Sequence, residues 1–212
     1  MYGYLHETDD STAINFSAYG KFIPGENTGL QLLTIGAKFL RIFRVNPYVS
    51  SRENGVWQQK TKLECIFSCR LLNKCQSVAI TRTPQIPDQD SILMTFDDAK
   101  LSIVTINEKE RNLQTLSLHA FENEYLRDGF AHHFAVPIVR TDPLNRCAAS
   151  LVYGKHIAIL PFHENSKRIH SYVIPLKQID PRLDNVADMV FLDGYYEPTI
   201  LFLYEPLQTT PG

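Results

Sequence analysis

The sequence predicts an all-β protein built from β-propeller blades, each a four-stranded antiparallel sheet of the WD40-like kind. Three observations lead to this fold class. The 212 residues include ten tyrosines and twelve phenylalanines, and aromatic side chains favour strands. Short apolar runs are separated by polar turn residues, as in β-hairpins. These hairpins recur at intervals of roughly 40–60 residues, which is the period of a propeller blade.

The hairpin pattern is clearest in Ser91–Ile106, where two apolar runs flank the polar break Asp97–Lys100. Aspartate tolerates the backbone angles of a tight turn, so Asp97 and Asp98 are expected to be turn residues. A pair of carboxylates can also serve in acid–base chemistry, which is the alternative interpretation.

The same unit returns with turns near Gly36, Asp98 and Gly154, and Tyr204-Glu205-Pro206 takes the equivalent place after a later strand. A single four-stranded sheet cannot bury both faces, whereas radially stacked sheets bury them against each other. Residues 1–212 would form one partial propeller of about three to three and a half blades, with no second domain. A complete β-sandwich or barrel is the alternative.

A propeller usually closes with at least four blades. The chain is therefore expected to be the N-terminal part of a longer protein. Its open sheet edges would then favour association or poor solubility of the isolated chain.

The elements up to Asp90 follow from alternation and turn residues. Ala13–Phe22 is expected to be an opening strand, and Leu30–Val45 a hairpin that turns at Gly36. Asn46–Gln59 is polar and contains proline and glycine, so it is expected to be an exposed loop. The next segments are an alternating strand at Thr61–Leu71, a short strand at Cys75–Thr81 and a loop at Thr83–Asp90.

The second half repeats the pattern of strands and turns. Ala120–Phe130 does not alternate, so a short helical turn ended by Gly129 is expected there. Gly154-Lys155 is expected to be a two-residue hairpin turn, and Ile179–Asn185 to be irregular. The expected strands are Leu113–His119, Val136–Arg140, Cys147–Tyr153, His156–Phe162, Ile169–Leu176 and Pro198–Tyr204. Val186–Leu192 is an apolar run that precedes a turn at Asp193-Gly194.

Composition narrows the possible functions. The formal net charge of −2 and the pI near 6.4 provide no overall basic field for nucleic acid. Four cysteines are too few for a disulfide scaffold, the N-terminus lacks the apolar run of a secretory signal, and no stretch is long enough to span a membrane. We expect a soluble intracellular protein.

The residues that could carry chemistry have simpler structural interpretations. Cys65, Cys69 and Cys75 follow a C-x3-C-x5-C spacing, which lacks the second pair of a structural zinc site, so they are expected to be small core residues. His132-His133 would point to opposite faces of a strand. His156 and His163 have no nucleophile beside them. We therefore expect no catalytic residue, no metal site and no cofactor.

Basic residues are the remaining candidates for binding. Arg41 and Arg44 lie on one expected strand near Lys38, and Lys167-Arg168 is a loop pair. Positions three apart on a strand face opposite sides, so Arg41 and Arg44 form no stripe. A solvated rim explains all of these residues. Weak RNA or phosphate contacts by Arg41, Arg44, Lys167 and Arg168 are the functional alternative.

Several long segments resemble one known family. SILMTFDDAKLSIV (Ser91–Val104), TLSLHAFENEYLRDGF (Thr115–Phe130), RCAASLVYGKHIAILPF (Arg146–Phe162) and DGYYEPTILFLYEPLQTTPG (Asp193–Gly212) resemble, in this order, the N-terminus of the largest subunit of the cleavage and polyadenylation specificity factor. Related families include the large subunit of the damaged-DNA-binding protein. The LRDGF and YYEPT elements favour the polyadenylation family.

The resemblance implies a fold and a role. Family members contain three β-propellers and a helical C-terminal part, so this chain would supply opening blades of the first propeller. It implies a non-catalytic nuclear scaffold in the formation of messenger-RNA 3′ ends. The implied partners are a WD-repeat subunit and a zinc-finger subunit, which read the polyadenylation signal, and a separate endonuclease subunit. Contact with RNA would then be mostly indirect.

Overall fold

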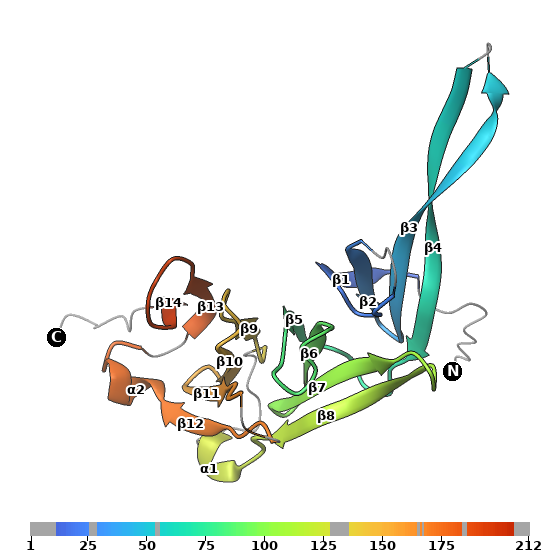
Figure 1. Ribbon diagram of the computed structural model, residues 1–212. Coiled ribbons are helices and arrows are strands. Elements are labelled where there is room, and N and C mark those ends of the chain that lie inside the picture. The colour runs from blue at the N-terminus through green and yellow to red at the C-terminus, as the bar shows by residue number, and fades with distance from the viewer. Residues whose placement is uncertain are drawn as a thin grey trace, which may run out of the picture. The chain divides into compact units, whose positions relative to one another are not determined.

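The computed structural model confirms the expected fold class, because the described residues form almost only antiparallel strands (Figure 1). It describes residues 12–25, 29–53, 56–127, 136–164, 166, 168–183 and 186–205, with the backbone alone at 47–53 and 56–60. The chain divides into two compact units, residues 1–21 with 25–74 and residues 22–24 with 75–212. Each unit is described by itself.

The first unit contains one four-stranded sheet, whose strands follow each other in chain order. Its strands are β1 (Ile14–Gly20), β2 (Gln31–Gly36), β3 (Phe39–Glu53) and β4 (Val56–Arg70). Leu33, Ile35, Leu40 and Ile42 are buried on one face. The expected turn at Gly36 is present, and a Cβ atom at that position would lie 2.5 Å from the carbonyl oxygen of Ala13.

The expectation of a loop at Asn46–Gln59 is wrong. β3 and β4 remain paired from Phe39 opposite Arg70 to Glu53 opposite Val56, as two long strands (Figure 1). Proline is tolerated where a strand has a free edge, and β3 has one beyond Phe43 because its pairing with β2 ends there. The polar composition of this segment therefore did not exclude strands.

A β-bulge in β4 reverses which face of the sheet its alternating side chains occupy. Phe67 lies opposite Ile42 whereas Cys65 lies opposite Phe43, so Ile66 is an extra residue between them. Paired residues share a face of the sheet and neighbouring residues do not. Phe67 is therefore buried with Ile42, while Cys65 lies on the other face.

The second unit contains two four-stranded sheets and a two-stranded sheet among its described residues. In each sheet the strands pair in chain order, the up-and-down connectivity of a propeller blade. The second sheet is formed by β5 (Ser77–Thr81), β6 (Ser91–Phe96), β7 (Lys100–Asn107) and β8 (Asn112–Ala120); the third by β9 (Val139–Thr141), β10 (Cys147–Val152), β11 (His156–Pro161) and β12 (Tyr172–Pro175); and the fourth by β13 (Val186–Leu192) and β14 (Thr199–Tyr204).

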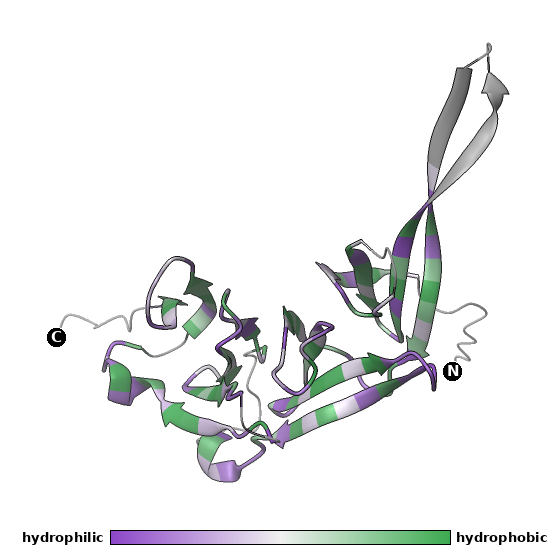
Figure 2. Ribbon diagram, in the orientation of Figure 1, coloured by the Kyte–Doolittle hydropathy of each residue, from purple (hydrophilic) through white to green (hydrophobic). Residues whose placement is uncertain are grey.

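The third sheet is buried on both faces by its neighbours. On β10, Ala148 and Val152 join a core with residues of β6 and β7, whereas Ala149 and Leu151 join another with residues of β13. The first strands contact one another, β5 with β9 and β9 with β13. Hydrophobic residues lie along the strands of these sheets (Figure 2). This is the packing expected of radially stacked blades.

Two hairpin turns have the backbone that tight hairpins require. Asp98 and Ala99 have φ angles of 58° and 50°, and Tyr153 and Gly154 have φ angles of 50° and 67°. Two successive residues with positive φ form a type I′ turn, which matches the twist of the flanking strands. The turn expected at Gly154-Lys155 is therefore shifted by one residue.

Two short helices lie between strands. α1 (Glu124–Arg127) falls within the expected helical turn, whose end at Gly129 lies outside the described residues. α2 (Leu176–Ile179) extends into the segment expected to be irregular and buries Leu176. No helix in the described ranges is long and apolar enough to cross a membrane.

Candidate functional site

The basic residues of β3 are engaged by neighbouring side chains. Arg41 lies with its guanidinium carbon 4.9 Å from the ring centre of Phe39. Arg44 pairs with Glu64 at 2.9 Å, and this hydrogen bond holds the pKa of the Glu64 carboxyl below its usual value. The charge of Arg44 is thus balanced within the sheet, which leaves Arg41 as the better phosphate-binding candidate of the two.

The second pair of candidates lies in the other unit. Lys167 lies outside the described residues, and Arg168 is exposed. The hydroxyl of Ser166 donates to the carbonyl of Arg168 at 2.5 Å and accepts from its backbone N–H at 3.3 Å, which fixes the local turn. Weak RNA contacts by Arg41, Arg44, Lys167 and Arg168 therefore stay a prediction.

Asp97 and Asp98 have separate structural roles. Asp97 accepts a hydrogen bond of 2.6 Å from the side-chain amide of Gln76, while Asp98 pairs with Arg127 at 2.7 Å. Asp98 also takes the positive φ angle of the turn. Both carboxylates are therefore used to hold the hairpin end, as the turn interpretation requires.

Arg127 on α1 connects two sheets and was not identified from the sequence. Its guanidinium binds Asp98 in the β6–β7 turn, and it donates to the hydroxyl of Tyr153 in the β10–β11 turn at 3.1 Å. A further contact of 3.2 Å reaches Glu122. These hydrogen bonds and charges raise the pKa of Arg127. The sequence marked Arg127 only as the arginine of the LRDGF element.

The expectation that the cysteines are core residues fails for Cys65. Cys65 is exposed and Cys69 is half-buried, because the bulge at Ile66 places them on different faces. Cys75 is buried, and burial raises its pKa to about 12, so its thiol is unreactive. Within the described ranges no three His, Cys, Asp or Glu side chains are grouped to hold a metal ion.

The histidines have different surroundings. His132 and His133 lie outside the described residues, and His163 is exposed. His156 lines a hollow of about 520 Å³ together with Glu124 and Tyr125 of α1 and Lys177 of α2. This hollow combines the anionic Glu124 with the cationic Lys177.

Polar side chains join the second and third sheets along their first strands. Thr141 donates to the carbonyl of Ile80 at 2.9 Å, and the backbone N–H of Val139 donates to the hydroxyl of Ser77 at 3.2 Å. Asn145 accepts from the hydroxyl of Thr81 at 3.0 Å. Such directional bonds fix the register of one blade against the next.

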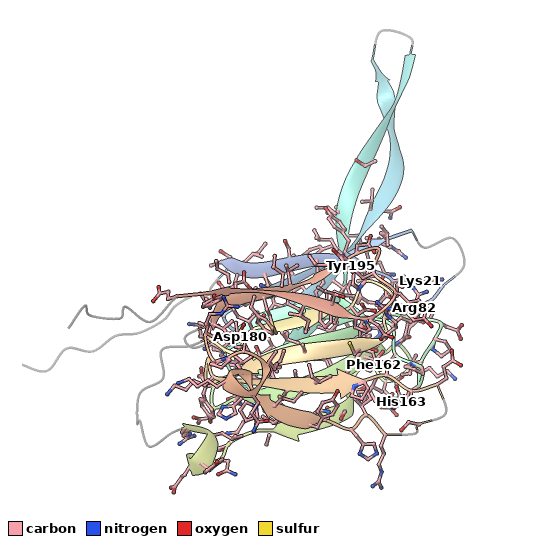
Figure 3. All side chains as sticks on the ribbon, turned by 90° about the vertical axis from the view of Figure 1, so that its left-hand side faces the viewer. Lys21, Arg82, Phe162, His163, Asp180 and Tyr195 are labelled. Atoms are coloured by element: carbon pink, nitrogen blue, oxygen red, sulfur yellow. The ribbon has the colours of Figure 1, made fainter. Side chains whose placement is uncertain are left out.

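An ion pair in the β9–β10 turn of the third sheet has a buried carboxylate and a partly exposed guanidinium. The Asp142 carboxylate has no exposed side-chain surface and binds Arg146 through both oxygens, at 2.7 and 2.8 Å. This pairing lowers the pKa of Asp142. Arg146 also donates to the carbonyls of Tyr195 and Tyr196 in the β13–β14 loop. Figure 3 shows Tyr195 at the same end of the sheets as Arg82 and His163.

His119 joins the outer strands of the second and third sheets. Its Nδ1 lies 2.9 Å from the hydroxyl of Ser171, and its Nε2 lies 2.6 Å from that of Ser117. Burial, and then the charge of His170, lower the pKa of the His119 imidazole. The neutral imidazole of His119 is therefore the form that bonds Ser117 and Ser171.

The His119 contact predicts a pH dependence of stability. The folded pKa lies below the unfolded value of about 6.5, so the stabilisation is complete above that pH and is lost as the pH falls towards the folded pKa. Hydrogen exchange of β8 and β12 in the full-length protein, corrected for intrinsic rates, should show less protection at pH 5.5 than at 7.5. His119→Gln should remove much of this difference, and the exposed control His163→Gln should not. An unchanged pH dependence in His119→Gln would contradict the prediction.

The chain is similar in sequence to the same subunit of one complex in several organisms. It is 85% identical over its full length to the probable cleavage and polyadenylation specificity factor subunit 1 of Caenorhabditis elegans, and 33% identical to subunit 1 of Drosophila melanogaster. The Arabidopsis thaliana subunit is 30% identical over 79% of the chain. The chain spans 13–16% of the length of these relatives. No family model matches it.

Proposed function

Since the chain belongs to the family of cleavage and polyadenylation specificity factor subunit 1, as an N-terminal segment of it, we propose that it acts in messenger-RNA 3′-end processing as part of a non-catalytic nuclear scaffold. The observation that carries the proposal is the match over the whole chain to relatives in nematodes and fly. The scaffold organises the WD-repeat and zinc-finger subunits that recognise the polyadenylation signal, and it assembles with the endonuclease subunit.

The stacked sheets support a scaffold role. The third sheet is held on both faces by apolar cores. The hydrogen bonds of Arg146 to the β13–β14 loop and the contacts of Arg127 fix its loops to neighbouring sheets. A rigid set of loops presents a constant surface to partners, which reduces the entropy lost on binding. RNA is then contacted mainly by the partner subunits. Direct RNA binding by Arg41 and Arg168 is the alternative.

Residues 1–212 are part of one propeller in this proposal, and further chain completes the fourth sheet. The outward face of β13 and β14 carries exposed apolar side chains, with Val190, Leu201 and Leu203 at 47%, 57% and 66% exposure. A groove of about 310 Å³ beside β14 is lined by Ile159, Tyr172 and other residues. A following blade would cover this outward face in a completed propeller, as the radial stacking of sheets requires.

Assembly of purified subunits tests the proposed function. The full-length protein is mixed with the WD-repeat and zinc-finger subunits, and the masses of the complexes are measured by light scattering. We expect one stable complex that contains all three proteins, because a scaffold binds both partners at separate surfaces. Failure of the full-length protein to bind either partner would contradict the proposal.

A further inference from the structure

Three loops of the second unit lie at one end of their sheets, because each follows the first strand of its sheet. They are residues 82–90 after β5, residues 142–146 after β9 and residues 193–198 after β13. β9 contacts both β5 and β13, so the three loops are neighbours. Figure 3 shows Arg82 and Tyr195 at this end. We call these three loops the loop surface.

Hydrogen bonds between the loops fix the backbone of the loop surface. The side-chain oxygen of Asn145 accepts from the backbone N–H of Arg82 at 3.0 Å. Arg146 donates to the carbonyls of Tyr195 and Tyr196, and Asp142 holds its guanidinium in place. A surface that is ordered before it binds loses less conformational entropy on association.

The fixed loops expose large apolar side chains. Leu144 is 62% exposed, and Tyr195 and Tyr196 are 53% and 93% exposed. Arg146 joins the two loops that carry them, so these side chains belong to one patch rather than to scattered positions. Tyrosine is enriched among the residues that dominate binding energy at protein interfaces. Blades of a propeller stack against the faces of each other's sheets, which leaves the loops at the ends of the strands open to other molecules.

The loop surface is acidic. Its three loops contain five acidic and two basic side chains, which gives a formal charge of −3; the acidic ones are Asp88, Asp90, Asp142, Asp193 and Glu197, and the basic ones are Arg82 and Arg146. Both arginines are paired within the loops, Arg82 with Asp90 at 3.0 Å and Arg146 with Asp142 at 2.7 Å. An acidic surface attracts a basic partner and repels both RNA phosphates and a second copy of itself.

We propose that the loop surface docks a segment of a partner subunit that carries apolar and basic side chains. The apolar side chains of this segment pack on Leu144 and Tyr196, and its basic side chains lie against Glu197 and the other acidic groups. The partner is a protein rather than RNA, because the exposed patch is apolar and its surroundings are acidic. This inference rests on the proposed function, since it places the chain in a complex with other subunits.

Cross-linking from Tyr196 tests which molecule covers the loop surface. Tyr196→p-benzoylphenylalanine places a photoreactive aromatic group in the full-length protein, which is assembled with purified WD-repeat, zinc-finger and endonuclease subunits and RNA, and then irradiated. Mass spectrometry identifies the cross-linked peptides. We expect the main cross-link to join Tyr196 to a peptide of one partner subunit that contains more basic than acidic side chains.

A matched control uses Tyr125, which is 84% exposed on α1. α1 lies at the other end of the sheets, because its Arg127 binds the β6–β7 and β10–β11 turns. Tyr125→p-benzoylphenylalanine should not cross-link to the peptide that Tyr196 reaches. The same cross-link from both positions would show non-specific contact and would overturn the docking inference.

The affinity of the cross-linked subunit for the full-length protein provides a second measurement. Tyr196→Ala with Leu144→Ser should raise the Kd at least about tenfold, as truncation of hot-spot residues does, whereas Tyr125→Ala should leave it within about twofold. Asp88→Asn with Glu197→Gln should slow association and reduce its dependence on salt, because charges at the rim of an interface steer the encounter. All of these side chains are exposed, so the fold should tolerate the changes.

Other cross-links would identify other occupants of the loop surface. A cross-link from Tyr196 to its own chain, to a second copy or to RNA would overturn the docking inference alone, and so would an assembled complex without any cross-link. Unchanged affinity of the Tyr196→Ala and Leu144→Ser variant would contradict it as well. If no complex forms, the proposed function fails and the docking inference fails with it.

Discussion

Leu160→Ala should lower the free energy of unfolding of the second unit by about 3 kcal/mol, within the range measured for buried leucines. Leu160 lies on β11 with no exposed surface, in the core that the third sheet shares with β6 and β7. The substitution removes apolar contacts between two sheets and leaves a cavity that both sheets line. Rigid strands close such a cavity only partly, so the loss exceeds that from transfer of the side chain alone.

Hydrogen exchange of the full-length protein measures this effect, because a long multi-domain chain does not unfold in one step. Protection should fall together in β6, β7, β10 and β11. The matched control is Leu118→Ala, which alters an exposed leucine of the same unit and should change protection little. Equal loss of protection in both variants would show that Leu160 is not part of a shared core.

Asp142→Asn should destabilise the β9–β10 turn of the third sheet by about 1–3 kcal/mol, the cost of leaving a buried hydrogen-bonding group without its partner. The Asp142 side chain is fully buried, and its carboxylate accepts from the backbone of Leu144 and from Arg146. Part of the Arg146 side chain is exposed to solvent, which places the expected loss of stability at the lower end of this range. The β13–β14 loop should lose protection as well, because Arg146 also binds its carbonyls.

The pH dependence of the Asp142 pair provides a second measurement. Its pKa lies below the ordinary value of 3.8, so the stabilisation is complete above about pH 4 and is lost as the pH falls through the folded pKa. Asp142→Asn should therefore resemble the natural protein more closely at strongly acid pH. Asp180→Asn is the control, because Asp180 pairs with Arg182 at the solvent-exposed surface, where water screens the charges. An effect as large in Asp180→Asn would contradict the role of burial.

Hairpins could be predicted from the sequence because their signals are local. The strand at Ser91–Phe96, the turn at Asp98 and the strand Thr199–Tyr204 all lie where apolar runs and turn residues indicated. The signals failed where one residue changes the register. The bulge at Ile66 moves Cys65 to the exposed face although its alternation with Phe67 is regular in the sequence.

Contacts between sheets could not be read from the sequence, because they join residues that are distant along the chain. His119 meets Ser171 from another sheet, and Arg127 meets both Asp98 and Tyr153. No local pattern marks one histidine or arginine for such a contact. The paired strands in Asn46–Gln59 were missed for a different reason: proline, glycine and polar residues give this segment the composition of a loop.

The central claim is that this chain contributes architecture rather than direct contacts with RNA. The most direct test measures the affinity of the reconstituted complex for RNA that carries the polyadenylation signal. Leu160→Asp places a charge in the core between two sheets and should weaken binding at least about tenfold through loss of assembly, since an unpaired buried charge is very costly. Leu118→Asp, at an exposed position, and Arg41→Ala with Arg168→Ala should keep the affinity within about twofold. If the arginine variant loses tenfold while Leu160→Asp binds normally, the chain contacts RNA directly and the scaffold account is wrong.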